Sequence, residues 1–190
     1  GHATLASAYA YFNILKNDTA SITLNSASGE LKVNNAEDYL ELDFPKDKYN
    51  KVDRVKRVEE ATGTKPIETY LGDINLFAVY EHENNITSIK PNFNLVSQLD
   101  GQGLIISSTS ESYDFVSRYF CPKYGINEDP VTGSAHTTLI PYWSDRLNKD
   151  KLIAKQISTR GGELYCTNLK DRVLIGGHAV LYMKGTIEVD

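Results

Sequence analysis

The chain begins with an apolar stretch that has the spacing of a helix. Residues 1–17, GHATLASAYAYFNILKN, are rich in Ala and Leu, carry little charge before Lys16, and place Tyr9, Phe12 and Leu15 at helical spacing. Such a composition is typical of a helix that is apolar almost all round. The pattern therefore predicts a first helix that is buried on every side.

Alternating apolar and polar positions follow and predict strands. Short alternating runs, separated by Ser-Gly and Asn-Asn turn signals, occupy residues 21–24, 30–33 and 39–44, which is the spacing of hairpins. Pro45 and the charged run to Asn50 are typical of a linker. Residues 51–63 then repeat Val at three-residue spacing and end on Gly63, which predicts a surface helix.

The remaining chain predicts further strands and a second long helix. We expect strands at residues 74–81, in the segment before Pro91, at 103–110 and at 112–120, with a short helix before Gly101. A helix is expected over residues 134–147, where Pro141 should bend it or remove a hydrogen bond. From residue 155 the pattern predicts three strands, with turns at residues 160–162, 168–171 and 184–185.

Two segments of the chain resemble each other. GHATLASAYAYF (1–12) and GSAHTTLIPYWS (133–144) each begin with Gly, carry His early, continue through small residues and Thr, and finish on aromatic residues. Strand-like hairpins follow both. The repeat predicts an α+β fold of two similar halves, each a curved sheet around a central helix.

Composition narrows the functional classes. The 190 residues are 41% hydrophobic with a formal net charge of -5, which suits a soluble globular protein with one large core or two small ones. No apolar run approaches the roughly 20 residues of a membrane span, and no signal peptide is visible. The 20 basic residues are scattered among 25 acidic ones, which argues against binding to nucleic acid.

The two cysteines add information about compartment and metal binding. Cys121 and Cys166 have neither C-x-x-C spacing nor a companion Cys/His cluster, which disfavours a zinc site and a disulfide framework. A reducing cytoplasm is the expected location. Cys121 is interpreted as a half-buried small hydrophobic residue rather than a nucleophile.

The starts of the two similar helices are candidate anion-binding sites. A helix start has four unpaired backbone N–H groups and a partial positive charge, and Gly1 and Gly133 would let a ligand approach the backbone closely. Two such starts facing one cleft would hold a small carboxylate from both sides. Ser134 is the N-cap candidate, or Thr132 if the helix begins earlier.

Simpler interpretations of the same residues stay open. Glu128 and Asp129 would merely complement the helix dipole, and His136 would pack in the first turn. A Gly-His pair at a chain start is also typical of a cleaved affinity tag, although the match of His2 to the second helix start argues against this. His82 and His178 look structural or solvated. No Ser-His-Asp motif, phosphate loop or G-x-G-x-x-G motif is present.

Three segments together resemble the PhzF family of phenazine-biosynthesis-like isomerases, which share the diaminopimelate epimerase fold. They are GHATLASAYAYF, SRYFCPKYGINEDPVTGSAHTTLIPYW and QISTRGGELY followed by RVLIGGHAVLYMKGTIEV. The resemblance covers nearly the whole chain and implies two pseudo-symmetric barrel-like domains with the active site between them. Residues 1–46 would be the remainder of an N-terminally incomplete first domain. Residues 47–190 would form the second, with the last strand able to return to the first. A homodimer is also implied.

The resemblance also implies a reaction. Members of the family use no metal or organic cofactor, and a carboxylate moves a proton between carbons of a small carboxylate-bearing substrate, as in the isomerisation of a dihydro-hydroxyanthranilate. His2 and Asp129 match the family's active-site histidine and aspartate. Gly133 and Ser134 match its ligand-facing helix start, and Gly1 and Thr132 complete the expected substrate-binding set. The family's principal catalytic glutamate belongs to a segment that would precede Gly1, and we expect it there.

Two other functions remain as alternatives. The fold could be a non-catalytic module whose cleft binds a small anion or a protein partner, because no residue of this sequence matches the catalytic glutamate. A diaminopimelate-type epimerase is disfavoured, since related epimerases carry a cysteine at each helix start and this chain has Gly1 and Gly133 there.

Overall fold

A single large sheet organises the molecule. The computed structural model describes residues 1–26, 29–36 and 38–188, and within them eleven strands pair in the order β1-β2-β3-β11-β10-β9-β8-β7-β6-β5-β4. Two neighbouring pairs, β6 with β7 and β8 with β9, are parallel. The strands are β1 Ser21–Ser26, β2 Gly29–Ala36, β3 Tyr39–Pro45, β4 Tyr49–Lys51, β5 Glu68–Gly72, β6 Leu76–Val79, β7 Leu104–Thr109, β8 Phe115–Phe120, β9 Lys151–Gln156, β10 Gly162–Asn168 and β11 Arg172–Gly177.

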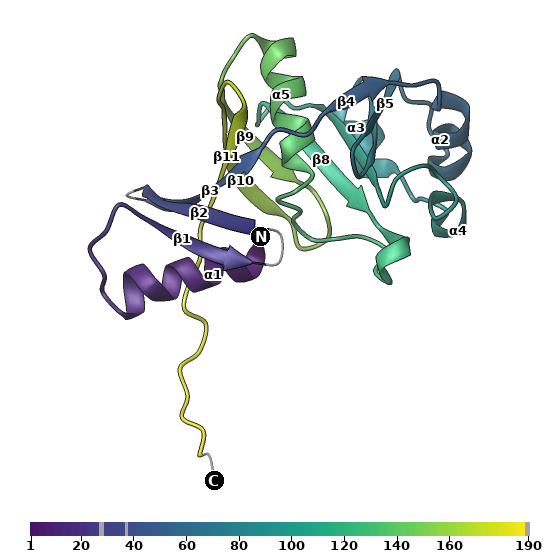
Figure 1. Ribbon diagram of the computed structural model, residues 1–190. Helices are drawn as coiled ribbons and strands as arrows, with labels where there is room; N and C mark the ends of the chain where they lie inside the picture. The colour runs from purple at the N-terminus through teal and green to yellow at the C-terminus, as the bar shows by residue number, and fades with distance from the viewer. Residues whose placement is uncertain (27–28, 37, 189–190) are drawn as a thin grey trace.

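Short helices cover this sheet, which confirms the expected mixed α+β class. Figure 1 shows α1 beneath β1–β3, α5 beside β9–β11, and α2 and α4 at the opposite end of the molecule. The helices are α1 His2–Tyr9, which continues as a π-helical turn Ala10–Ile14, α2 Val55–Thr62, α3 Glu83–Ser88, α4 Phe93–Val96 and α5 His136–Leu147, with a 3-10 turn at Pro122–Tyr124. Among the described residues, no helix has both the length and the apolar composition needed to cross a membrane.

The central strands are buried on both faces, which explains their continuous apolar runs. In β6, Leu76 and Ala78 pack in a cluster with α2, α3 and α4. Phe77 and Val79, on the other face, pack in a second cluster around α5. Successive side chains of β6 point to opposite faces of the sheet, so this one strand contributes to two cores.

A third, smaller core lies under α1. It is formed by the buried side chains Ala8, Phe12, Val33, Leu40 and Leu42. The first two come from the helix and its π-helical turn, and the others from β2 and β3. The division of the chain at residues 46 and 47 into two domains stays a prediction.

The first helix differs from its expected burial. Among the described residues, α1 packs on one side only, against β2 and β3. Ala3, Ala6 and Ser7 of α1 are exposed, and Ile14 and Leu15 at the end of the predicted helix are 47% and 68% exposed. The prediction of burial on every side was wrong for this structure, because composition shows how apolar a helix is but not how many of its faces meet another element.

Pro141 leaves α5 continuous and frees one carbonyl. A proline has no N–H to donate to the carbonyl four residues earlier, which here belongs to Thr137. That carbonyl instead accepts the backbone N–H of Asp47 at 3.3 Å. The Thr138 hydroxyl also donates to Asp47 Oδ2 at 2.6 Å. The segment between β3 and β4 is thus tied to α5 at the point where the proline interrupts the helix.

Several local predictions were wrong. The segment before Pro91 forms α3 rather than a strand, and the side chain of Asn85 in its first turn accepts the backbone N–H of His82 at 3.1 Å. The predicted linker already contains the start of β4, and β5 was missed. Beyond Gly177 the chain has no strand through residue 188, so the turn expected at residues 184–185 connects no hairpin.

A polar cluster joins α5 to the paired strands β4 and β5 through Glu68. Its carboxylate accepts bonds from Arg146 at 2.6 Å, Tyr142 at 3.0 Å, Tyr70 at 3.1 Å and Lys51 at 3.1 Å. Burial raises the pKa of Glu68, but these donors, Arg146 foremost, outweigh it and lower the pKa to about 2. The ionised carboxylate therefore stabilises the folded state.

We expect Glu68→Gln to lower the free energy of unfolding by about 1–2 kcal/mol near neutral pH, because the donors lose a charged acceptor. Since the pKa falls from 4.5 to about 2 on folding, this stabilisation is complete above pH 4.5 and is lost as the pH falls towards 2. Urea unfolding as a function of pH measures it, with the exposed Glu60→Gln as control. A difference between wild type and Glu68→Gln that does not shrink with acid would contradict the assignment.

Candidate active site

A cavity of about 380 Å³ lies between the start of α1 and the start of α5. Gly1, His2 and Leu5 line it from the α1 side, and Val131 and Gly133 line it from the loop that leads into α5. The other lining residues come from β3 and from the hairpins β9–β10 and β10–β11: Leu42, Arg160, Gly161, Gly162, Glu163, Leu164, Ile175, Gly176, Gly177 and His178. The two similar segments of the sequence thus meet at one cavity.

Glycines at the cavity serve two different purposes. An added Cβ at Gly1 or Gly133 would meet no atom within 4 Å, so their backbones face open space that a ligand can enter. At Gly162, an added Cβ would lie 2.4 Å from Val131 Cγ2. Gly162 is therefore required for packing of the cavity wall, whereas Gly1 and Gly133 leave room.

The loop before α5 is held by a buried glutamine. Gln156 Oε1 accepts the Thr132 backbone N–H at 2.8 Å, and its Nε2 donates to the Asp129 carbonyl at 2.7 Å. The Thr132 hydroxyl donates to Asp129 Oδ2. Gln156 is 0% exposed, so these bonds are shielded from water and fix the backbone that leads into Gly133.

His136 is a packed core residue. Its ring lies 5.9 Å from that of Phe115, and Nδ1 lies 2.8 Å from the Thr132 carbonyl, to which it donates. Burial lowers the pKa of His136 to about 4, so the ring is neutral near neutral pH. Nε2 has no partner among the described residues. The imidazole supports the loop from behind rather than lining the cavity.

The structure brings together half of the predicted site residues. Gly1, His2 and Gly133 line the cavity, whereas Asp129, Thr132 and Ser134 are not among the residues that line it. Two of these are engaged in the loop: Asp129 accepts from Thr132, and Thr132 lies in the Gln156 network.

The start of α5 differs in detail from the predicted one. The residue at the N-cap position is Ala135, with no side-chain cap, and Ser134 is exposed. The N-cap prediction for Ser134 and Thr132 was therefore wrong. Glu128 does not complement the helix dipole either, because both its oxygens accept from Arg118, at 2.7 and 2.9 Å.

Consecutive glycines of β11 point to opposite sides of the sheet. A Cβ on Gly177 would lie 3.8 Å from Leu5 of α1, on the cavity side. A Cβ on Gly176 would lie 2.6 Å from the Tyr39 ring on the other side. The opposite face thus carries an aromatic group, in which Tyr39 stacks on Tyr165 at 4.5 Å between ring centroids.

Three lining residues with ionisable side chains were not selected from the sequence. The sequence places Arg160 only in a turn, and its pattern predicts that His178 is structural or solvated. Glu163 and His178 belong to the aromatic face: Tyr165 donates its hydroxyl to Glu163 Oε1 at 2.8 Å and lies 3.3 Å from His178 Nε2. Arg160 has no such engagement. The sequence signal that could have found them is the pair of double glycines, Gly161-Gly162 and Gly176-Gly177, next to which all three residues lie. Glycine in a strand often marks a place where a ligand or another backbone approaches closely.

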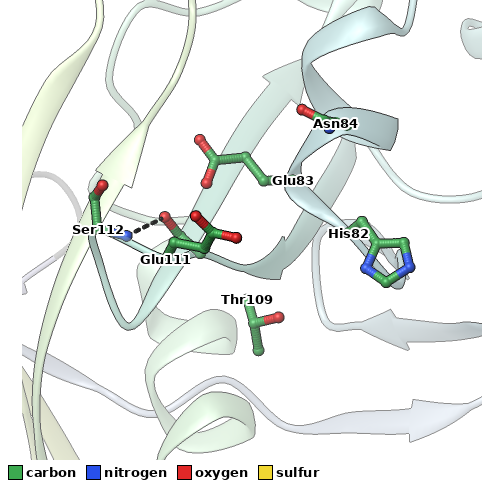
Figure 2. Close-up of a pocket in the computed structure, with 7 residues that line it drawn as sticks. His82, Glu83, Asn84, Thr109, Glu111 and Ser112 are labelled. Atoms are coloured by element: carbon green, nitrogen blue, oxygen red, sulfur yellow. Dashed lines mark hydrogen bonds between the residues drawn. The ribbon is translucent and has the colours of Figure 1, made fainter.

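A second cavity, of about 510 Å³, lies elsewhere. Its lining is polar and includes none of the predicted site residues: His82, Glu83, Asn84, Thr109, Ser110, Glu111 and Ser112. Figure 2 shows the Glu83 and Glu111 side chains extending into the same space. Among the described residues, no group of three or more His, Cys, Asp or Glu side chains is placed to hold a metal ion. The smaller cavity is the candidate site because both helix starts meet there.

Both cysteines are remote from this chemistry. Cys121 and Cys166 are buried free thiols, each 2% exposed. Burial raises the pKa of the Cys121 thiol to about 11 and also raises that of Cys166. Neither sulfur is a thiolate near neutral pH, in agreement with the prediction that Cys121 is a packing residue.

Comparison with known proteins gives one consistent family. A family model described as phenazine biosynthesis-like protein (PhzC-PhzF) matches residues 1–185. An uncharacterized isomerase of Pseudomonas aeruginosa is 41% identical over 189 residues, which cover 100% of this chain and 72% of the relative. The crystal structure of a PhzF-family protein of Enterococcus faecalis aligns with a TM-score of 0.94 at 45% identity, covering 100% of this chain and 73% of that one. A predicted epimerase of Pseudomonas aeruginosa, at 17% identity and a TM-score of 0.70 over 96% of this chain and 74% of that one, shares the fold.

We expect Gly133→Val to fold normally but to lose ligand binding, because the new side chain would occupy open space in the cavity. Its free energy of unfolding should stay within about 0.5 kcal/mol of wild type, while the affinity for benzoate, measured by calorimetry, should fall at least about tenfold. Gly162→Ala provides the contrast. It should cost about 1–3 kcal/mol of stability by pushing against Val131. Unchanged benzoate binding by Gly133→Val would show that the cavity is not the anion site.

Proposed function

The chain belongs to the family of phenazine biosynthesis-like proteins, and from this premise we propose that it is a cofactor-independent isomerase that moves a proton between two carbons of a small carboxylate-bearing metabolite. Homologues are named isomerases. The observation that carries the proposal is that the start of α1 at Gly1 and the turn at Gly133 that leads into α5 open onto one cavity, whose apolar floor is Leu42, Leu164 and Ile175.

The two helix starts supply what a proton shift next to a carboxylate requires. When a proton leaves a carbon beside a carboxylate, negative charge moves onto the carboxylate oxygens. Backbone N–H groups and helix dipoles that point at those oxygens stabilise the charge most strongly where water is excluded. Leu5 and Val131 line the cavity with apolar side chains. The same donors that bind the ground state therefore favour the transition state more.

His2 and Asp129 are the proposed catalytic side chains of this chain. His2 lines the cavity at the first turn of α1, where its imidazole would contact the substrate. Asp129 uses Oδ2 to accept from Thr132, and Oδ1 has no hydrogen bond among the described residues. We propose that Oδ1 meets a polar group of the substrate, while Thr132, Gly133 and Ser134 hold and present the helix start.

A non-catalytic binding module is the second candidate, and one observation favours it. Glu163 is the acidic residue that lines the cavity. Its carboxylate accepts a hydrogen bond from the Tyr165 hydroxyl on the opposite face of the sheet. Asp129 does not line the cavity at all. A cavity that holds an anion with backbone donors, and with no carboxylate directed into it, would bind without reaction.

Location and assembly are further parts of the proposal. We propose a reducing, cytoplasmic compartment, because the two buried cysteines are free thiols. A homodimer is proposed from the family resemblance. Light scattering coupled to gel filtration measures the assembly, and a monomer at micromolar concentration would contradict it.

We expect the complete protein, including the proposed catalytic glutamate, to incorporate deuterium from D₂O into dihydro-hydroxyanthranilate or related cyclic amino acids. Asp129→Asn should slow this exchange by about 10²–10⁴-fold, which is the usual size of a lost acid, base or charge-stabilising contact. NMR or mass spectrometry measures the exchange. Asp171→Asn, at the turn between β10 and β11, is the matched control.

Binding of these compounds without exchange by wild type would contradict the isomerase and support the binding module. Exchange that is unchanged in Asp129→Asn would remove Asp129 from the proposal and leave the isomerase standing. Circular dichroism of each variant checks that the fold is retained.

A further inference from the structure

Arg160 differs from every other arginine of the chain. Five of the six arginines in the sequence form ion pairs: Arg54 and Arg57 with Asp100, Arg118 with Glu128, Arg146 with Glu68 and Arg172 with Asp43. Within the described part of the chain, Arg160 forms no hydrogen bond, ion pair or cation–π contact. It is also the arginine that lines the cavity between the helix starts.

The backbone that carries Arg160 is held in place. The Ser158 hydroxyl donates to the Pro130 carbonyl at 2.7 Å and accepts the Gly161 backbone N–H at 3.0 Å. Gly161 has φ 67°, a conformation that favours glycine. These contacts tie the β9–β10 turn to the loop that leads into α5. The position of Arg160 relative to Gly133 is therefore set by the fold, although its side chain is exposed.

The two helix starts and Arg160 place positive charge at the cavity, and Glu163 is the single acidic residue that lines it. Each helix start contributes about half a positive charge, and Arg160 adds a full one. Glu163 does not neutralise Arg160 by an ion pair, since its carboxylate is on the aromatic face with Tyr165. A guanidinium without a partner at the mouth of an apolar cavity is suited to bind a planar oxyanion through two parallel hydrogen bonds.

We infer that Arg160 binds a second anionic group of the ligand, so that the site favours dicarboxylates over ligands with a single carboxylate. One carboxylate would lie at the helix starts and the other against the Arg160 guanidinium, with the carbon skeleton over Leu164 and Ile175. The inference rests on the proposed function for the first carboxylate. It adds a specificity-determining residue to the site and restricts the ligands that it accepts.

Calorimetric binding of unreactive probes tests this without catalysis. Benzoate carries one carboxylate, and isophthalate and terephthalate carry two at different spacings. We expect wild type to bind at least one of the two dicarboxylates about tenfold or more tighter than benzoate, with a preference that weakens as salt is added. Arg160→Gln should remove the preference and leave benzoate affinity within about threefold.

Two variants serve as references. Lys170→Gln removes one exposed positive charge from the β10–β11 turn and should keep the dicarboxylate preference, which separates a local contact from the net charge of the protein. Arg160→Lys keeps the charge but loses the planar pair of donors, and should retain only part of the preference. Thermal unfolding of each variant confirms an intact fold.

The outcomes separate this inference from the proposed isomerase. Equal binding of benzoate and both dicarboxylates by wild type, or an equal loss of all three in Arg160→Gln, would overturn the role of Arg160. Deuterium exchange does not enter this decision. A protein that prefers dicarboxylates through Arg160 but exchanges no deuterium keeps the inference and loses the isomerase.

Discussion

Pairing of β3 with β11 is the constraint on which the rest of the structure depends. These strands are antiparallel, with Leu42 opposite Ile175 and Leu40 opposite Gly177. They join the segment that carries α1 to the segment that carries α5 within one sheet. The register also places Gly177, which has no side chain, next to Leu5 of α1. The two strands are separated by more than half of the chain. Without their pairing, nothing in the sheet would bring the two helix starts together.

Around that junction, polar groups fall into two kinds. Structural ones are satisfied: Gln156 and Thr132 hold the loop before α5, and the Glu68 carboxylate takes four donors at the far end of the same helix. Buried polar groups are costly unless paired, so this pairing stabilises the fold. Arg160, which lines the cavity, has no such partner among the described residues. The contrast between the engaged arginines and Arg160 is the clearest case, because the same residue type is paired wherever it serves the fold.

The site also shows how the protein separates ligand contact from support. Gly1 and Gly133 expose backbone to the cavity, while His136 is buried and neutral and packs beneath the loop. Glycine lets a ligand reach the backbone, but it loses more conformational entropy on folding than other residues. The buried hydrogen bonds of Gln156 hold the loop before α5 in one conformation. Rigid presentation of backbone donors is what makes a helix start effective toward a developing negative charge. The positions of the supporting residues therefore matter as much as those that touch the ligand.

The sequence by itself determined much of the fold. Alternation predicted β1, β2, β3, β6, β7 and β8, three-residue spacing and Gly63 predicted α2, and the repeated Gly-His segments indicated that two helix starts belong to one site. These signals are local: each depends on the period of a strand or helix, or on a residue type that permits a turn. The main error also has a local cause. His82 is the N-cap of α3, and the Asn85 side chain accepts its backbone N–H, a contact that the apolar pattern before Pro91 does not reveal. Only the tertiary structure decided which side chains reach the cavity. The Glu163 carboxylate is held by Tyr165, which stacks on Tyr39. The Ser158–Pro130 bond fixes the turn that brings Arg160 to the cavity, and the Gln156 network keeps Asp129 in the loop. Each arrangement depends on a contact between residues far apart in the chain.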